Sequence, residues 1–368
     1  MAQMTGAQAL TRSLIREGVE VVFALPGVQI MEAFNALYDE PSLRLVLVRH
    51  EQSAAYMADG YARTTGKPGV AMVVPGPGAL NATAALGTAF ASSSPVMLIS
   101  GQIESYNLGA NRGALHEIGE QLDVFKHLTK WCERSIENSE IPTMVHRAFQ
   151  QLTTGRPRPV EIEIPWDILP GQSEIELLER EVHPKVRPEP SDIKSAVDAL
   201  ARAERPLIWV GGGAREANLS PELLEFAQAL NAPVITTPEG KGAFPDNNIL
   251  SLGTVYNGHG PGHHVVPQSD VILAIGTRMH MVPKVEWSPQ PHQTLIQIDA
   301  DPEEVGRNIP ATIGIAADGR LALQDLLSEL GGRTRTSNWT PQELESVSYT
   351  HLRAHETRHD LVCRLLLE

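Results

Sequence analysis

The chain has 368 residues, more than one ordinary hydrophobic core accommodates, so two domains are expected. Apolar residues make up 42% and charged residues 20%, and the net charge of −14 comes without a basic stripe, which argues against a nucleic-acid partner. Cys132 and Cys363 lie far apart without C-x-x-C spacing, which argues against a disulfide framework and is typical of the cytoplasm. No signal-peptide core or apolar run of membrane-spanning length occurs, so we expect no membrane partner.

Short apolar runs alternate with helical stretches through the first half of the chain. This alternation predicts βαβ units around a parallel sheet, and the continuously apolar strands indicate that helices cover both of its faces. Strands are expected at 19–25, 43–48, 69–74, 95–100 and 158–168, and helices at 6–17, at 29–38, after residue 50 and at 79–92.

A Pro- and Glu-rich stretch follows and is predicted to be an exposed linker. A second α/β unit begins near residue 191, with strands expected at 206–213, 232–237, 270–276 and 294–301. The predicted fold class is therefore α/β, with two doubly wound parallel-sheet domains. The expected boundaries are 1–170 for the first domain, 171–190 for the linker, 191–332 for the central domain and 333–368 for the remaining segment.

Ligands of open α/β sheets bind at the carboxyl ends of the strands, and the first domain offers four such ends. Three carry Gly or Pro turns that let a ligand approach the backbone: Leu25-Pro26-Gly27, Pro75-Gly76-Pro77-Gly78 and Ser100-Gly101. The fourth is His50-Glu51, which places a carboxylate where a strand leads into a helix. Neither G-x-G-x-x-G nor G-x-x-x-x-G-K-[ST] occurs, so nothing marks a dinucleotide or P-loop site.

Glu51 has two interpretations from its position alone. In the first turn of a helix, a carboxylate interacts favourably with the helix dipole and needs no further role. At a strand end, a carboxyl group can instead exchange or share a proton with a bound ligand. A similar choice applies to His116, since a lone histidine after a strand is more often a surface or packed residue than a catalyst.

Three further segments have a structural and a functional interpretation each. The histidines of NGHGPGHHVV (His259, His263 and His264) indicate a flexible loop, with a metal site as the alternative. The Gly211-Gly212-Gly213 run after an expected strand can meet a phosphate with its N–H groups or form a tight turn. Asp299 and Asp301 end another strand, where a carboxylate can accept ribose hydroxyls or shape a turn.

Several motifs together resemble the thiamine-diphosphate-dependent enzymes of the acetolactate synthase and benzaldehyde lyase type. The most specific is RHEQSAAYMADGYAR with the downstream VPGPGALNATAAL, and the others are FALPG, RPVEIEIPWDI, GGG and IDADPEEVGR. The resemblance runs from about residue 4 to about residue 330. It implies a pyrimidine-binding domain followed by a central domain, and it favours the functional interpretation of Glu51.

In this family, the position matching Glu51 hydrogen-bonds a ring nitrogen of the aminopyrimidine of thiamine diphosphate and promotes loss of the thiazolium C2 proton. The resemblance implies carboligation, decarboxylation or carbon–carbon lysis of a small 2-oxo acid or 2-hydroxy ketone by a homodimer or homotetramer. The catalytic candidates are Glu51, Gln29 and His116. The cofactor-side positions are Pro26, Gly27, Glu51, Gly76 and Asn81, and the positions matching FAD contacts are Arg156, Gly211, Gly212, Gly213, Arg278, Asp299 and Asp318.

The sequence departs from the acetolactate synthase pattern in three places. Val28 and Gln29 follow the Pro-Gly turn where a second glycine is usual. Leu115-His116-Glu117 stands where Phe-Gln-Glu is usual, and Arg278-Met279-His280-Met281 replaces an acidic flavin segment. These departures bear on acetolactate as the product and on FAD as a ligand.

The family binds the diphosphate through Mg²⁺ in a third domain marked by Gly-Asp-Gly, which does not occur in this sequence; Ala317-Asp318-Gly319 is a partial echo. The last stretch, THLRAHETRHDLVCRLLLE, resembles translated adapter sequence. We therefore expect a fragment that is interrupted near residues 346–348, is inactive alone and holds no metal itself. Two alternatives stay open: a non-catalytic nucleotide- or flavin-binding module, and a split enzyme with its third domain on another chain.

Overall fold

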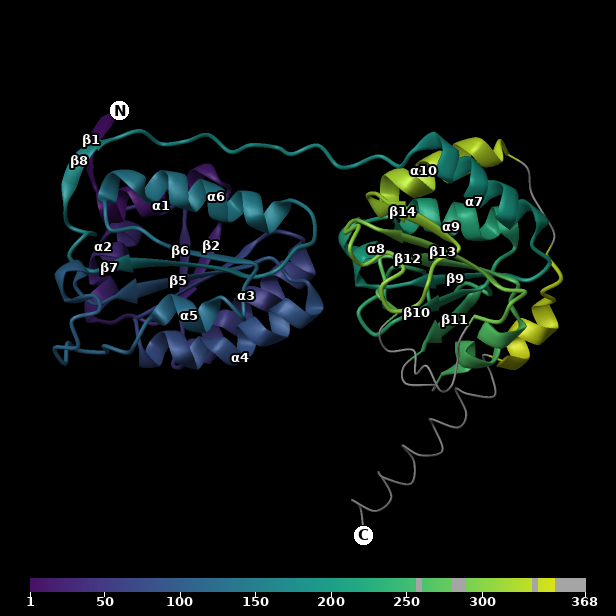
Figure 1. Ribbon diagram of the computed structural model, residues 1–368, viewed down its shortest axis with the longest axis horizontal. Coiled ribbons are helices and arrows are strands. Elements are labelled where there is room, and N and C mark those ends of the chain that lie inside the picture. The colour runs from purple at the N-terminus through teal and green to yellow at the C-terminus, as the bar shows by residue number, and fades with distance from the viewer. Residues whose placement is uncertain (256–259, 280–288, 333–336, 348–368) are drawn as a thin grey trace, which may run out of the picture. The chain divides into compact units, whose positions relative to one another are not determined.

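The computed structural model describes residues 1–255, 260–279, 289–332 and 337–347, except the side chains of Glu216, Pro261 and His263. The chain divides into two compact units, the first from Met1 to His183 and the second from Pro184 onward (Figure 1). Each is an α/β unit built on a six-stranded parallel sheet, which confirms the predicted fold class. Within the described residues, no helix combines the length and apolarity needed to cross a bilayer.

The sheet of the first unit has the strand order β3-β2-β4-β5-β7-β6. All five neighbouring pairs are parallel, so the carboxyl ends of the strands gather at one edge. The strands are β2 (Val21–Ala24), β3 (Arg44–Leu47), β4 (Gly69–Val73), β5 (Val96–Gln102), β6 (Trp131–Arg134) and β7 (Val160–Pro165).

Helices cover both faces of this sheet, as Figure 1 shows. One face packs against α1 (Gly6–Arg16), α2 (Met31–Tyr38) and α6 (Ile141–Thr153), and the other against α3 (Glu51–Thr65), α4 (Pro77–Ser92) and α5 (Gln121–Phe125). The second face is rich in alanine. A Cβ at Gly69 would lie 2.0 Å from the main-chain oxygen of Ala58, so α3 lies directly on β4. The small residues of α3 therefore serve close helix–sheet packing.

The N-terminus is tied to the end of the first unit by a small separate sheet. β1 (Ala2–Thr5) pairs antiparallel with β8 (Gln172–Ile175), which lies inside the segment predicted to be a linker. That segment is therefore not wholly extended linker, because its first residues contribute a strand. Thr5 then caps α1 in a reciprocal pair of hydrogen bonds with Gln8.

The second unit has the strand order β11-β10-β9-β12-β13-β14, which is the doubly wound order of dinucleotide-binding folds. Its apolar core lies between this sheet and the flanking helices. The strands are β9 (Pro206–Val210), β10 (Val234–Thr236), β11 (Ser251–Thr254), β12 (Val271–Ile275), β13 (Thr294–Asp299) and β14 (Ile313–Ala316). The α-helices of this unit are α7 (Pro190–Arg202), α8 (Gly212–Glu216), α9 (Ser220–Leu230) and α10 (Gly319–Leu330). Short 3₁₀ turns lie at Val28–Ile30, Ser105–Asn107 and Asn138–Glu140 in the first unit, and at Pro261–His264 and Val266–Gln268 in the second.

Sequence patterning found the central strands and the edge strand β3, and it missed the other three edge strands of the two six-stranded sheets. These strands, β6, β11 and β14, are short, and each lies at the edge of its sheet, where a continuous apolar run is not required. The sequence Trp-Cys-Glu-Arg of β6 gives no continuous apolar signal. Pairing with β7 instead places Cys132 and Arg134 opposite Glu161 and Glu163.

Candidate functional site

The predicted strand-end loops of the first unit meet at one edge of the sheet. The best evidence is Gly101, at the end of β5. A Cβ there would lie 2.7 Å from Ile30 Cγ2, 2.9 Å from Pro75 Cδ and 3.2 Å from the main-chain oxygen of Gln29. The turns after β2, β4 and β5 therefore touch one another, and glycine is needed where they converge.

Val74 sets the spacing between two of these turns. A Cβ on Gly27 would lie 2.2 Å from Val74 Cγ1, and a Cβ on Gly78 would lie 2.5 Å from Val74 Cγ2. The two methyl groups of one buried side chain thus occupy the space that side chains at two glycines would need. Both turns therefore pack directly against this one side chain, and glycine is needed at each contact.

Glu51 begins α3 and is half-buried at the same edge. Its Oε2 accepts a hydrogen bond from Asn81 Nδ2 at 2.9 Å, and its Oε1 lies 3.5 Å from the position of a Cβ on Gly78. The preceding His50 caps the helix by accepting from the N–H of Gln52 at 3.1 Å. Because the helix already has a cap, Glu51 is not needed for that purpose, although its first-turn position still suits the helix dipole.

Gln29 and His116 both present buried polar atoms without a hydrogen-bond partner among the described residues. Gln29 as a residue is 3% exposed, and its Nε2 donates to the main-chain oxygen of Leu115 at 3.0 Å. Its Oε1 and the Nδ1 of His116 have no partner. His116 also adopts a left-handed φ of 67°. An unsatisfied buried polar atom costs about 1–3 kcal/mol, so a ligand that supplies a donor here would be stabilised.

Gly76 lies between β4 and α4 in a conformation that favours glycine, with φ 55° and ψ −115°. A Cβ there would lie 2.3 Å from the main-chain oxygen of His116. Its N–H donates to Gln121 Oε1 at 2.8 Å. Gln121 is fully buried at the start of α5 and was not among the residues predicted from the sequence, because an isolated Gln in a short polar helix gives no signal.

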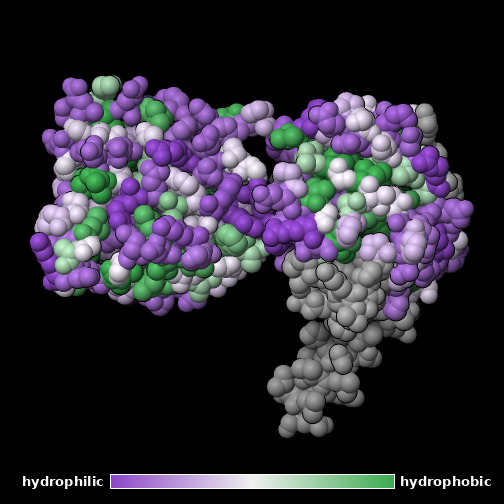
Figure 2. Space-filling view, viewed as in Figure 1, coloured by the Kyte–Doolittle hydropathy of each residue, from purple (hydrophilic) through white to green (hydrophobic). Residues whose placement is uncertain are grey.

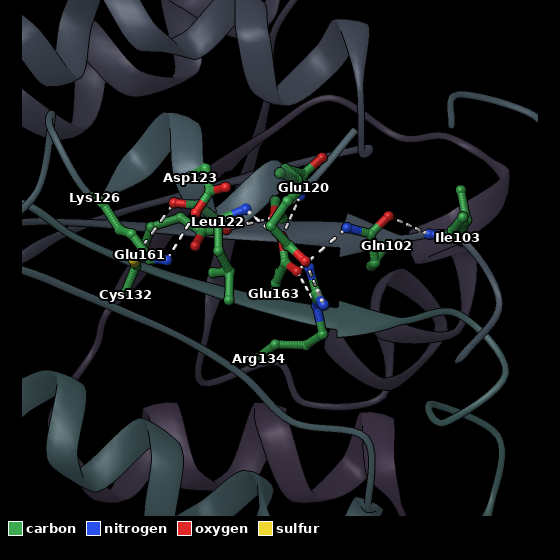
Figure 3. Close-up of polar contacts among 12 residues, drawn as sticks. Gln102, Ile103, Glu120, Leu122, Asp123, Lys126, Cys132, Arg134, Glu161 and Glu163 are labelled. Atoms are coloured by element: carbon green, nitrogen blue, oxygen red, sulfur yellow. Dashed lines mark hydrogen bonds and ion pairs between the residues drawn. The ribbon is translucent and has the colours of Figure 1, made fainter. Parts of the chain in front are cut away.

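A buried acidic pair on β7 lies behind this loop, and it also escaped prediction. Glu161 and Glu163 alternate with Ile162 and Ile164, so both carboxyl groups point to one face of the sheet. Burial, followed by the charge of Glu163, raises the pKa of Glu161 well above its ordinary value of 4.5. Burial also raises the pKa of Glu163, against the opposing effect of Arg134. Figure 3 shows Arg134 directed at Glu163, with Glu120 as its second partner.

In the second unit, the predicted glycines lie where the strand order reverses. A Cβ on Gly211 would lie 2.2 Å from the main-chain oxygen of Gly276, and one on Gly213 would lie 3.0 Å from Gly276 Cα. A Cβ on Gly212 would lie 3.1 Å from Glu239 Cβ. These contacts account for the glycines as a tightly packed strand-end turn at the position where such folds bind nucleotides.

The remaining residues of the predicted flavin set make internal contacts. Asp318 caps α10 by accepting from the N–H groups of Arg320 and Leu321, and Lys185 lies 2.8 Å from its other oxygen. Asp299 accepts from the N–H of Asp301 at 3.0 Å, and the main-chain oxygen of Arg278 accepts from Asn308 at 2.8 Å. Arg156 belongs to the first unit, where its Nε donates to Ser93 at 2.9 Å.

The predicted histidine segment lies only partly within the described residues. Within residues 1–255, 260–279, 289–332 and 337–347, no group of three or more His, Cys, Asp or Glu side chains is arranged to hold an ion. His264 is exposed, whereas His259 and the side chain of His263 lie outside the described residues. The terminal stretch at 348–368 also lies outside them.

Two family models match the chain. The first, described as "Thiamine pyrophosphate enzyme, N-terminal TPP binding domain", matches residues 4–124. The second, "Thiamine pyrophosphate enzyme, central domain", matches residues 193–326. The two matches fall in the first and second compact units respectively.

Curated relatives cover nearly the whole chain. A probable acetolactate synthase large subunit of Methanocaldococcus jannaschii is 38% identical over 337 residues, which is 89% of this chain and 56% of that protein. The acetolactate synthase large subunit of Haemophilus influenzae is 35% identical over 349 residues, 91% of this chain and 60% of that protein. A probable 2-ketoarginine decarboxylase of Pseudomonas aeruginosa is 34% identical over 336 residues, 91% and 59% respectively. The chain thus spans somewhat more than half the length of these relatives.

Proposed function

Because the chain belongs to the thiamine pyrophosphate enzyme family, we propose that its first unit binds the aminopyrimidine of thiamine diphosphate, with Glu51 as the carboxyl group that shares a proton with the ring. The placement of Glu51 carries the proposal: it begins α3 at the strand-end edge and is held by Asn81 at 2.9 Å. A fixed carboxyl group within reach of a ring nitrogen can act as an acid or a base. When bound, thiamine diphosphate supplies the electron sink for negative charge at a former carbonyl carbon.

The other predicted residues have separate tasks in this proposal. Asn81 occupies Oε2 of Glu51, which leaves Oε1 to meet the ligand beside Gly78. The unpartnered Gln29 Oε1 accepts from a ligand donor, and His116 Nδ1 offers a second polar contact. Gly27 and Gly76 let their turns pack closely against Val74 and the main chain of His116, which fixes the loops around the proposed ligand, and Pro26 stiffens the turn that carries Gly27.

The proposed reaction class is carboligation, decarboxylation or lysis of 2-oxo acids or 2-hydroxy ketones. It is supported by relatives named as acetolactate synthases and as a probable 2-ketoarginine decarboxylase. We propose that Mg²⁺ and the diphosphate are held by a domain marked by Gly-Asp-Gly, a motif that this sequence does not contain. The 368-residue chain alone is therefore expected to turn over little substrate. Turnover by the purified chain with thiamine diphosphate and Mg²⁺ would contradict that expectation.

The role of Glu51 is testable by cofactor binding and by proton exchange. Calorimetric titration of the chain with thiamine, which carries the aminopyrimidine without the diphosphate, should show binding that Glu51→Gln weakens about 10- to 100-fold, the usual worth of a hydrogen bond to a charged group. Exchange of the cofactor C2 proton, followed by ¹H NMR in D₂O, should slow in the same variant. Glu222→Gln alters a first-turn glutamate of α9 in the other unit and should change neither readout. Equal exchange rates in the wild type and in Glu51→Gln would remove the assignment.

We further propose that two copies associate through α3 and α4. Tyr56, Met57 and Leu80 are each about 40% exposed on these helices. Figure 2 shows apolar residues along the lower edge of the first unit, where Figure 1 places α4. Sedimentation velocity should show a dimer or tetramer that the pair Met57→Glu and Leu80→Glu dissociates. Tyr38→Glu, on the exposed end of α2, should leave it intact; a monomeric wild type would refute the proposal.

FAD is proposed only as a non-redox ligand of the second unit. The support is the doubly wound strand order with a glycine turn at its reversal point. Against it, the described contacts of Gly211, Gly213 and Asp318 are all internal. Flavin absorbance in the purified protein that Gly212→Val abolishes would support FAD, and colourless protein after incubation with FAD and gel filtration would remove it.

A further inference from the structure

The Gln121 side chain joins the Gly76 turn to the buried polar cluster on β5, β6 and β7. Its Oε1 accepts the N–H of Gly76 at 2.8 Å. Its Nε2 donates to Glu163 Oε2 at 2.7 Å and also lies 3.0 Å from Ser100 Oγ and 3.3 Å from the main-chain oxygen of Gly101. All of these atoms are buried. No water is needed to complete the contacts, so the carboxamide bridges the loop and the sheet directly.

We propose that Gln121 is a positioning residue of the cofactor site, which fixes the main chain of Gly76 from within the protein, and that Glu163 sets the orientation of its carboxamide. The expected effect of Gln121 on ligand binding rests on the proposed function of the first unit. The contact between Gln121 and Gly76 itself is independent of any ligand.

The orientation of a carboxamide depends on which neighbours donate and which accept. A carboxylate is acceptor-only when ionised, so Glu163 selects the NH₂ end of Gln121. Ser100 donates its hydroxyl to Glu161 Oε1 at 2.6 Å and is therefore an acceptor toward Gln121. Three acceptors thus surround Nε2, and a flipped carboxamide would place its oxygen against all of them. The same flip would set NH₂ against the N–H of Gly76, so the two ends of the side chain enforce one orientation.

Glu163 is itself held in place from two directions. Arg134 Nε donates to its Oε1 and the other end of the guanidinium pairs with Glu120, as Figure 3 shows. Gln102 Nε2 lies 3.3 Å from the same oxygen while its own Oε1 accepts from the N–H of Ile103. The positive charge of Arg134 favours the ionised form of Glu163 against the cost of burial. The chain of contacts therefore runs from Arg134 through Glu163 and Gln121 to Gly76.

The position of Gly76 matters because it has little freedom and many neighbours. Its N–H is the first main-chain donor of the turn that leads into α4, which carries Asn81 and through it holds Glu51. The main-chain oxygen of His116, a residue with a left-handed φ, lies 2.3 Å from the position that a Cβ on Gly76 would take. A shift of Gly76 would therefore move both the His116 segment and the start of α4. Small displacements at such a site are costly for a reaction that needs aligned groups.

The test compares two glutamates on the same strand and face. Glu163→Gln gives Gln121 a neighbour that can also donate, which removes the preference for one orientation, whereas Glu161→Gln changes a residue whose described contact is Ser100. Hydrogen exchange at the Gly76 amide, in a chain labelled with ¹⁵N-glycine, should accelerate at least tenfold in Glu163→Gln and in Gln121→Met. It should stay within about twofold of the wild type in Glu161→Gln.

Gln297→Met is the matched control for loss of a buried glutamine. Gln297 accepts from the N–H of Gly306 at 2.7 Å and donates to two main-chain oxygens, so it repeats the contact in the second unit. This variant should expose Gly306 to exchange and leave Gly76 protected. If Glu163→Gln does not fold, Gln121→Met carries the test, because it keeps the side-chain length and removes no charge.

The outcomes separate this inference from the proposed function. Unchanged protection of Gly76 in Gln121→Met overturns the inference even if the chain binds thiamine. Wild-type chain that binds no thiamine, together with a Gly76 amide that responds as expected, overturns the proposed aminopyrimidine site and leaves the loop contact standing. Support for both requires that Gln121→Met weaken thiamine binding at least tenfold while Gln297→Met leaves it unchanged.

Discussion

The spacing role of Val74 is the feature of the site that a stability measurement tests most directly. Gly27→Ala would place a Cβ 2.2 Å from Val74 Cγ1, whereas ordinary contacts begin near 3.4 Å, so about 1.2 Å must be gained by movement (3.4 − 2.2). Val74 is buried between two turns, so its side chain cannot relieve the clash by turning into solvent. Overpacking of this kind costs about 1–3 kcal/mol, and we expect the upper part of that range.

Val74→Ala alone removes two methyl groups, worth about 1.6 kcal/mol at about 0.8 kcal/mol each, and leaves a cavity that adds to the loss. In the double variant the new Cβ at residue 27 lies 3.6 Å from the Cβ of residue 74, an ordinary contact. The clash is gone and part of the cavity is filled. The double variant should therefore be about 1–3 kcal/mol more stable than the sum of the two single changes predicts.

The assay is urea unfolding followed by ¹⁹F-tryptophan NMR. Trp131 and Trp166 report on the first unit, and Trp209 and Trp339 on the second, whose transition should not move. Gly119→Ala is the matched control, because a Cβ there meets nothing within 4 Å. Additive effects within about 0.5 kcal/mol, or a Gly27→Ala cost no greater than that of Gly119→Ala, would refute the spacing role.

Three further predictions concern residues on strands β7, β6 and β4 of the first unit. The pKa of Glu161 is raised in the folded state, so the stability that this group contributes below pH 4.5 is lost as the pH rises from 4.5 toward the folded pKa. Over that pH range, the free energy of unfolding of Glu161→Gln, measured by urea titration, should rise relative to that of the wild type by up to about 1.4 kcal/mol per pH unit. Burial, followed by the charge of Glu161, raises the pKa of Cys132 to about 11, which leaves little reactive thiolate at pH 8.5. In the Cys363→Ser variant, iodoacetamide at pH 8.5 should therefore label Cys132 at least tenfold more slowly in the folded chain than in the chain unfolded by urea. Gly69→Ala should prevent folding of the first unit, because its Cβ would meet the backbone of Ala58, which cannot rotate away. Circular dichroism should then show a loss of helix and strand signal relative to the wild type.

Sequence reasoning located the edge of the sheet at which the candidate site lies, for a physical reason. In a parallel sheet every strand delivers its following turn to the same edge, so Gly27, Glu51 and Gly76 had to lie near one another once the strands were identified. The apolar runs that mark those strands are long because helices cover both sides. The hydrogen bond from Asn81 to Glu51 then follows from α3 and α4 lying side by side on one face.

The buried polar cluster could not be predicted in the same way. The alternation V-E-I-E-I-P shows that one face of β7 is polar, but the partner that makes two buried carboxyl groups tolerable is Arg134 on β6. β6 has no apolar run, so the pairing that brings Arg134 to Glu163 is invisible before the sheet is assembled. The contact of Gln121 with Gly76 spans 45 residues and depends on where the short α5 crosses the sheet.

The glycines of the strand-end turns pack against different neighbours in the two units. In the second unit, Gly211 and Gly213 lie against Gly276, so backbone packs on backbone. In the first unit, Gly27 and Gly78 lie on either side of a single valine, and at the same edge Gln29 Oε1 and His116 Nδ1 have no described hydrogen-bond partner. A stable fold rarely keeps two such atoms near one another without a use, because each costs as much as a good hydrogen bond contributes. The unsatisfied atoms, rather than the glycines, are therefore the observation that supports the ligand site proposed for the first unit.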